Sequence, residues 1–238
     1  MIKMKNLMTL AVLHIISCLF YPHVVMAQNE TDNPIEVSAG FDLVSRYVWR
    51  GMALSNGPSI QPSLIFQHQG LSLGVWGSAS FQPDDSHEID LNISYERGPF
   101  KLSVYDYFYT PDSLNPPFLN YKKDESMHVI EAIGEWNPSE TLPIRLLASV
   151  NLFGDDNNSS YFEAAYLSTI GLYDFEFFAG YTPQKGYYHT DKSGLTNVGL
   201  SVLKNIVSTE KIEIPLKISC LYAPLYNQAF IIFTIGIY

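Results

Sequence analysis

Arg46 and Arg50, spaced four residues apart, are the charged side chains of this sequence with the clearest potential for chemistry. They lie in segment 37–50, where apolar and polar residues alternate, and residues four apart in a strand project from the same face. Such a pair can be neutralised by carboxylates on that face, with Asp42 and Glu88 as candidates, or it can line a narrow opening and contact a solute. One arrangement can serve both roles, and the sequence keeps both open.

The same period of two sorts the other charged residues of the expected strands onto one face. Acidic residues outnumber basic ones on that face by ten to five. If the face encloses water, its negative potential favours cations. The candidate lining residues are Asp42, Arg46, Arg50, Glu88, Asp90, Lys101, Glu131, Arg145, Glu163, Glu176, Glu213 and Lys217, and the face also carries Glu96, Glu135 and Asp174.

The remaining polar residues give little support for catalysis. Ser126 and His128 are close in sequence and share a strand face, so they are the pair to consider as nucleophile and base. We favour the interpretation that they mark a junction between a loop and a strand. The sequence has no Gly-x-Ser-x-Gly motif and no spaced Cys/His set for a metal. We therefore expect no enzyme activity, cofactor or metal.

Three loops are rich in oxygen ligands, at 84–85, 124–125 and 155–158. Calcium prefers such ligands, but their spacing matches no known calcium loop. We interpret them as solvated loop tips.

The elements that would position these residues are short strands. Apolar and polar residues alternate in about twelve segments between 36 and 238, as in the alternation of Ile89 and Leu91 with Glu88 and Asp90. In segment 37–50 the apolar face ends in Tyr47 and Trp49, which we interpret as part of an aromatic girdle at a membrane interface. A soluble β-sandwich is the alternative, but it would require polar outer faces, which these strands lack.

The connections between the strands alternate between short and long. This order predicts an all-β, transmembrane, antiparallel up-and-down barrel of about twelve strands, with both termini on the side of the short turns. The short turns are 68–70, 97–99, 137–140, 169–171 and 208–209, and the long loops are 51–59, 82–87, 111–126, 154–160, 182–194 and 223–228.

The last segment, 230–238, is apolar on both faces, which suggests a strand that packs against contents of the barrel interior. The pattern leaves its register open. The terminal aromatic residue, Tyr238, suits recognition by the barrel-insertion machinery.

A resemblance to a known family supports the barrel. The run Ser45-Arg46-Tyr47-Val48-Trp49-Arg50-Gly51, then Ser55, Pro58 and Gln61, then Gly74-Val75-Trp76-Gly77-Ser78, resembles the opening of the TorF-type porin family, also called the Gcw_chp family. Met52-Ala53-Leu54 departs from the short polar run that is more common there. The resemblance covers about the first quarter of the mature chain. It implies an outer-membrane β-barrel and says little about the solute. The residues that match the motif are Ser45, Tyr47, Val48, Arg50, Gly51, Gly74, Trp76 and Ser78.

The N-terminus has the pattern of a secretory signal peptide. Lys3 and Lys5 precede an apolar stretch at 7–19, and Ala27 ends a small-residue cleavage site. We therefore expect a signal peptide at 1–27, a short segment at 28–35 and the barrel at 36–238. The alternative is a lipoprotein cleavage box at 15–18 that would leave Cys18 lipidated. Cleavage after Ala27 leaves Cys220 as the single cysteine, so an internal disulfide is excluded.

Composition agrees with this location. The chain of 238 residues has 24 acidic and 14 basic residues, which disfavours nucleic acid as a partner. Secretion, aromatic richness and a lack of helical pattern favour the bacterial outer membrane, with outer-membrane lipid, the insertion machinery and small hydrophilic solutes as partners. We expect passive passage of such solutes with a mild cation preference. The alternatives are a barrel enzyme acting on lipid at the rim and a plugged structural or surface-binding barrel.

Overall fold

We describe a computed structural model that covers residues 34–238 except 84, 111–115, 139–140 and 210–211. The expected signal peptide, 1–27, and residues 28–33 of the short segment that follows lie outside the described residues. No helix in the described part of the chain is long and apolar enough to cross a membrane.

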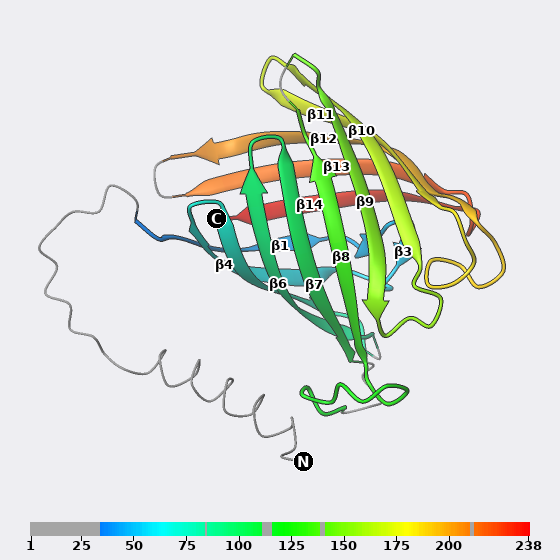
Figure 1. Cartoon of the computed structure of the whole chain (residues 1–238). Coiled ribbons are helices and arrows are strands. Elements are labelled where there is room, and N and C mark those ends of the chain that lie inside the picture. Colours follow the sequence, from blue (N-terminus) through cyan, green and yellow to red (C-terminus); the bar gives the residue numbers. More distant parts are fainter. Residues whose placement is uncertain (1–33, 84, 111–115, 139–140, 210–211) are drawn as a thin grey trace, which may run out of the picture. The chain divides into compact units, whose positions relative to one another are not determined.

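Twelve antiparallel strands close into a barrel, and a two-stranded hairpin, β2–β3, is present in addition (Figure 1). Each barrel strand pairs with the barrel strand that follows it in sequence, so the topology is up-and-down. The barrel strands are β1 (Glu36–Val44), β4 (Ser59–His68), β5 (Leu71–Ser80), β6 (His87–Arg97), β7 (Phe100–Thr110), β8 (His128–Trp136), β9 (Ile144–Phe153), β10 (Ser160–Ile170), β11 (Tyr173–Thr182), β12 (Gly194–Ser208), β13 (Glu213–Ala223) and β14 (Gln228–Ile237).

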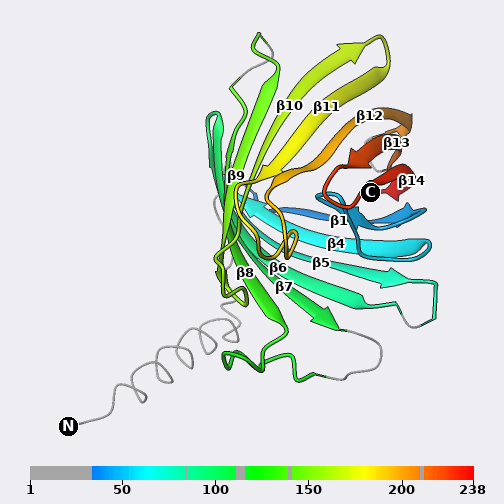
Figure 2. The same cartoon turned by 90° about the vertical axis from the view of Figure 1, so that its right-hand side faces the viewer.

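Pairing of the first and last strands closes the barrel. Phe41 of β1 lies opposite Ile237 of β14, and the other edge of β1 pairs with β4 along its whole length. In Figure 2 the blue β1 accordingly lies between the red β14 and the cyan β4. The predicted fold class, an all-β antiparallel barrel of about twelve strands, is confirmed.

The distribution of burial is the reverse of that in a water-soluble core. Outward residues are apolar and exposed: Leu102 is 66% exposed and Ile231 is 64% exposed. Inward residues include Glu131 and Asn151, both fully buried. Alternation with a period of two therefore separates an apolar exterior from a polar interior.

The turns at one end of the barrel are tight. Gln69 and Gly70 have φ angles of 50° and 84°. Positive φ at both central residues is typical of a type I′ turn, whose twist matches that of the two flanking strands. The turns after β6 and β10 likewise have a glycine at positive φ, Gly98 and Gly171. These turns fix the register in which the lumen residues face one another.

The structure settles the register of β14 and explains its two apolar faces. Ile231 and Phe233 are exposed on the outer face, whereas Phe230 and Ile232 are buried on the inner face. The inner pair forms a cluster with neighbouring apolar residues, and Val48 of the β2–β3 hairpin packs against it. The expectation that this strand packs against contents of the interior is confirmed.

The prediction of one strand over 37–50 is wrong in its last six residues. Strand β1 ends at Val44, the chain bends at 45–46, and β2 (Val48–Trp49) and β3 (Met52–Ala53) form a separate hairpin. The alternation continued through this bend because β2 is itself extended. The one interruption of the alternation, the polar Ser45 on the apolar face, lies at the bend where the chain leaves the barrel wall.

Candidate functional site in the barrel interior

The β2–β3 hairpin is built on a two-residue turn. Val48 pairs with Ala53 and Trp49 pairs with Met52, which leaves Arg50–Gly51 as the turn. The φ angles of these two residues are 48° and 86°, as a type I′ turn requires. The turn places the Arg50 side chain at the tip of the hairpin.

The tip contacts the wall of the barrel far from where the hairpin is attached. The hairpin connects β1 to β4, whereas Arg50 reaches Glu131 on β8, seven strands from β1 in one direction and five in the other. Gly51 lies against β12, because a Cβ added there would collide with the carbonyl oxygen of Thr196. The segment between β1 and β4, residues 45–58, therefore crosses the interior, and we refer to it as the crossing segment.

Arg50 and Glu131 form a buried, two-pronged ion pair. Nη1 of Arg50 lies 2.5 Å from Oε1 of Glu131, and Nη2 lies 3.2 Å from Oε2. The exposed fractions of the two side chains are 8% and 0%. Parallel contacts of this kind fix the orientation of both groups as well as neutralising them. The positive charge of the hairpin tip is thus bound to the opposite wall.

Two tyrosines complete the hydrogen bonding of this pair. The hydroxyl of Tyr188 accepts from Arg50 Nη1 at 2.5 Å and donates to Glu131 Oε1 at 3.1 Å. The hydroxyl of Tyr107 donates to Glu131 Oε2 at 2.7 Å. A buried charge pair is tolerated only when its remaining polar atoms are satisfied, and these hydroxyls provide that.

Aromatic rings surround the guanidinium group. Its Cζ lies 4.4 Å from the centroid of the Trp49 ring and 4.2 Å from that of Tyr161. Both distances are within the range of cation–π attraction. Arg50 is therefore held on several sides within the barrel interior.

The base of the crossing segment is fixed by Asp85, in the loop between β5 and β6. Its carboxylate accepts from Ser80 Oγ at 2.6 Å and from the Asn56 amide and side chain at 2.8 and 2.6 Å. The Ser80 hydroxyl and the Asn56 amide hold the pKa of Asp85 below its usual value. The segment is thus anchored at its base as well as at its tip.

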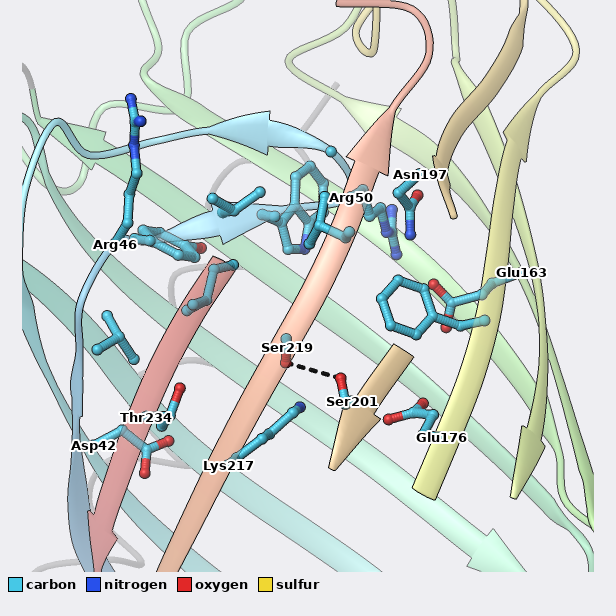
Figure 3. A pocket seen from close by; sticks show the side chains of 18 of the residues that line it. Asp42, Arg46, Arg50, Glu163, Glu176, Asn197, Ser201, Lys217, Ser219 and Thr234 are labelled. Atoms are coloured by element: carbon cyan, nitrogen blue, oxygen red, sulfur yellow. Dashed lines mark hydrogen bonds between the residues drawn. The ribbon is translucent and has the colours of Figure 1, made fainter. Parts of the chain in front are cut away.

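A cavity of about 460 Å³ adjoins the crossing segment. Asp42, Glu176 and Lys217, from three different strands, point into the same space (Figure 3). Arg145 binds two acids beside this cavity, Glu163 at 3.0 Å and Glu176 at 2.5 Å. The cavity walls therefore carry both signs of charge at close spacing.

The structure brings most of the predicted lining residues into the interior. The following line the large cavity: Asp42, Arg46, Arg50, Glu163, Glu176 and Lys217. Glu88, Asp90 and Glu131 are buried in the lumen, and Lys101 pairs with Glu135 at 3.7 Å.

Glu96, Asp174 and Glu213 were expected on the lining face but are exposed at strand ends beside the short turns. The period of two gives the face of the sheet but not the depth in the barrel, so it does not separate residues at the rim from residues deeper in the lumen.

The neutralisation of Arg50 by a carboxylate is confirmed, but the suggested partners are wrong. Arg50 binds Glu131, and Arg46 donates to the carbonyl of Ser55 at 2.9 Å, so neither arginine forms an ion pair with Asp42 or Glu88 among the described residues. The interpretation of the aromatic residues of this segment is also wrong. Tyr47 and Trp49 do not form an outer girdle. Both lie inside, in edge-to-face contact with Trp76 and Tyr107 respectively.

The other motif residues support the same region. Ser45 Oγ accepts from the backbone amide of Phe233, and Ser78 Oγ accepts from Gln61 at 3.3 Å. Gly74 leaves room for the side-chain amide of Asn92, which a Cβ there would strike. The motif therefore describes how the crossing segment and the wall beside it fit together.

Two functional residues, Tyr161 and Tyr188, were not predicted from the sequence. Tyr188 is 1% exposed although it lies in the long loop 183–193, where no periodicity marks an inward residue. The adjacent pair Tyr187–Tyr188 in an otherwise polar loop was the available signal.

The Ser126–His128 pair lacks the contact that a hydrolase would need. The His128 ring contacts Asp106 at 2.7 Å through Nδ1 and the Phe118 carbonyl at 2.5 Å through Nε2. Ser126 Oγ accepts from the His128 backbone amide at 3.0 Å. The serine therefore supports the start of β8, as expected for a junction between a loop and a strand.

The oxygen-rich loop 155–158 folds onto itself. The Asp155 carboxylate accepts from the amides of Asn157 and Ser159 at 3.0 and 2.7 Å. Within the described residues, no group of three or more His, Cys, Asp or Glu side chains could hold a metal ion.

Together these features define a closed antiparallel β-barrel with an apolar exterior, a polar interior and an inward-folded first loop. Residues 28–219 match the Gcw_chp family, described as a bacterial protein of unknown function, and the chain belongs to this family. Among curated proteins, none matches. One solved structure, reported under "Unveiling the Mechanism Behind the in-meso Crystallization of Membrane Proteins", is 9% identical with a TM-score of 0.42, over 86% of this chain and 83% of that chain.

Proposed function

We propose that this protein is a bacterial outer-membrane channel through which small hydrophilic solutes diffuse passively, with a mild preference for cations. The observation that carries the proposal is a closed barrel with apolar side chains outside and a charged cavity of about 460 Å³ inside. Lipid satisfies such an exterior and water satisfies such an interior. The proposal includes no catalytic step.

The TorF-type resemblance of segment 45–78 points in the same direction, because it implies a porin. The expected partners follow from the location. Outer-membrane lipid covers the apolar face, and the insertion machinery engages β14, which ends the barrel and pairs with β1.

The cation preference rests on how the lumen charges are paired. Arg50 is neutralised by Glu131, and Arg145 by two acids. Glu88 and Asp90 are buried in the lumen without a basic partner in the described part of the chain, and they add negative charge to it when they are ionised. Excess negative charge in a narrow lumen attracts cations, and more strongly at low salt, where screening is weak.

A plugged structural or surface-binding barrel is the second candidate. It is favoured by one specific observation: the crossing segment is anchored at both ends and binds the opposite wall through Arg50 and Glu131. A barrel sealed in this way would have a structural or surface-binding role and would not conduct ions.

Electrical recording distinguishes the two candidates. The purified protein is inserted into planar bilayers under a potassium chloride gradient, and swelling of proteoliposomes in sugars of graded size is measured in parallel. A channel gives discrete conductance steps and swelling only in the smallest sugars. Its reversal potential has the sign expected when potassium passes more readily than chloride. Insertion without conductance or swelling would support the plugged barrel, and a clear anion preference would refute the charge argument.

A further inference from the structure

A second, smaller cavity lies between the crossing segment and the barrel wall. Its volume is about 180 Å³. Four aromatic rings and one carboxylate line it, together with two apolar residues of the crossing segment. The rings are those of Trp49, Tyr107, Tyr109 and Tyr187, and the carboxylate is that of Glu88.

Glu88 lacks a counter-charge in this cavity. The residue is 7% exposed, and its Oε2 atom has no hydrogen-bond partner among the described residues. Asp90, two residues along the inward face of β6, is 5% exposed and has an equally unpartnered Oδ1 atom. The described part of the chain places no basic side chain in an ion pair with either acid. Burial of such carboxylates is costly unless a positive group accompanies them or a proton neutralises them.

The rings are arranged to accept a positive group. The centroid of Trp49 lies 5.6 Å from that of Tyr107 and 6.2 Å from that of Tyr187, at interplanar angles of 63° and 88°. Both pairs are in edge-to-face contact, and one face of Trp49 is covered by the Arg50 guanidinium at 4.4 Å, so the cavity is lined by the remaining ring surfaces. Ring faces carry partial negative charge, and groups of aromatic rings recognise quaternary ammonium ligands. The volume is below the roughly 300 Å³ at which drug-sized sites begin, so the ligand must be small.

We infer that this cavity binds a small organic ammonium cation, with Glu88 as its counter-charge and the rings of Trp49, Tyr107 and Tyr187 around its methyl or methylene groups. The inference deepens the proposed channel function and rests on it in one respect: the cation reaches the cavity through the lumen.

Binding of choline tests the inference. Isothermal titration of the full-length protein in detergent micelles is carried out with choline chloride against sodium chloride of equal concentration. We expect saturable binding at one site. Glu88→Gln removes the counter-charge and should weaken binding at least tenfold, and Tyr187→Leu, which removes a ring, should weaken it severalfold. Tyr187→Phe keeps the ring and should bind nearly as the wild type does.

Glu96→Gln is the matched control, because Glu96 lies on the same strand but is exposed at its end. It should leave choline affinity unchanged, and heat-modifiable gel migration verifies that each variant forms the barrel. Three results would overturn the inference: no saturable binding, as expected if Glu88 and Asp90 are neutralised by a shared proton; equal affinity in Glu88→Gln; or displacement of choline by glucose, which would indicate a carbohydrate pocket.

Binding and conduction are separate measurements, so the two proposals can fail independently. Choline binding without conductance in planar bilayers would refute the channel and keep the site. Conductance without choline binding would refute the site and keep the channel.

Discussion

Arg50 is held in a backbone conformation that its residue type seldom adopts. Its φ is 48°, and a non-glycine residue in this region costs on the order of 1–3 kcal/mol. Such a residue persists when its surroundings determine its position. Here the ion pair with Glu131 and the rings of Trp49 and Tyr161 supply that constraint. The side chain at the tip therefore stabilises the fold of its own hairpin.

Replacing Arg50 alone should be more destabilising than the loss of an ordinary ion pair. Arg50→Met leaves the Glu131 charge fully buried and unpaired, which typically costs about 3–5 kcal/mol. Restoring neutrality with Arg50→Met/Glu131→Gln should recover part of that loss. Urea unfolding from lipid vesicles measures both variants.

The control for this comparison is Lys122→Met, which breaks the exposed pair with Glu125. Exposed pairs contribute about 0–1 kcal/mol, so this variant should unfold nearly as the wild type does. Equal stability of Arg50→Met and Lys122→Met would contradict a structural role for the crossing ion pair.

Asp85 makes the anchor of the crossing segment sensitive to acid. Its pKa is lowered in the folded protein, so its stabilising effect is complete above its unfolded value of about 3.9 and is lost as the pH falls through the folded pKa. Asp85→Asn should cost roughly 1–3 kcal/mol at pH 7, since charged hydrogen bonds are lost. The difference from the wild type should shrink below about pH 4. A difference that is constant from pH 7 to pH 3 would exclude the carboxylate as its source.

At the scale of elements, sequence alternation predicted the barrel strands because an apolar exterior and a polar interior impose opposite requirements on successive residues. The crossing hairpin escaped prediction. Trp49 and Arg50 follow the same alternation as β1, and nothing local indicates that their environment is the lumen. Tyr188 was not predicted for a different reason: loop residues show no periodic alternation of apolar and polar side chains that would mark an inward position. Contacts across the barrel, such as that of Arg50 with Glu131, are separated by about eighty residues and leave no local pattern.

Displacing the hairpin should open the lumen without unfolding the barrel. Gly51→Ala places a Cβ against the Thr196 carbonyl in a position with φ of 86°, so the tip must move away from β12. We expect larger single-channel conductance with unchanged heat-modifiable migration. Gly98→Ala is the matched control, because Gly98 also has positive φ but a Cβ there meets nothing within 4 Å. Increased conductance in both variants would point to general loosening of the barrel instead.

At the scale of the whole molecule, two opposite requirements are met by a single sheet. Exposed side chains such as Leu91 and Val104 would be unfavourable in water, and buried ones such as Glu131 and Asn151 would be unfavourable in a dry core. The closed barrel reconciles them, because closure removes sheet edges and separates the two environments. The outer-membrane proposal therefore makes a prediction about where a charge is tolerated.

A charged residue introduced on the outer face should destabilise the barrel in lipid, whereas the same residue introduced in a loop should leave its stability unchanged. Leu91 lies at the middle of β6 and faces outward, so Leu91→Arg should destabilise the barrel in phospholipid vesicles by about 2–4 kcal/mol. Leu119 is 81% exposed and lies outside the strands, so Leu119→Arg should change stability by less than about 0.5 kcal/mol. Urea unfolding of both variants from vesicles, with cell fractionation beside it, provides the measurement. If Leu91→Arg is as stable as Leu119→Arg and the protein fractionates as soluble, the outer surface faces water and the membrane proposal fails.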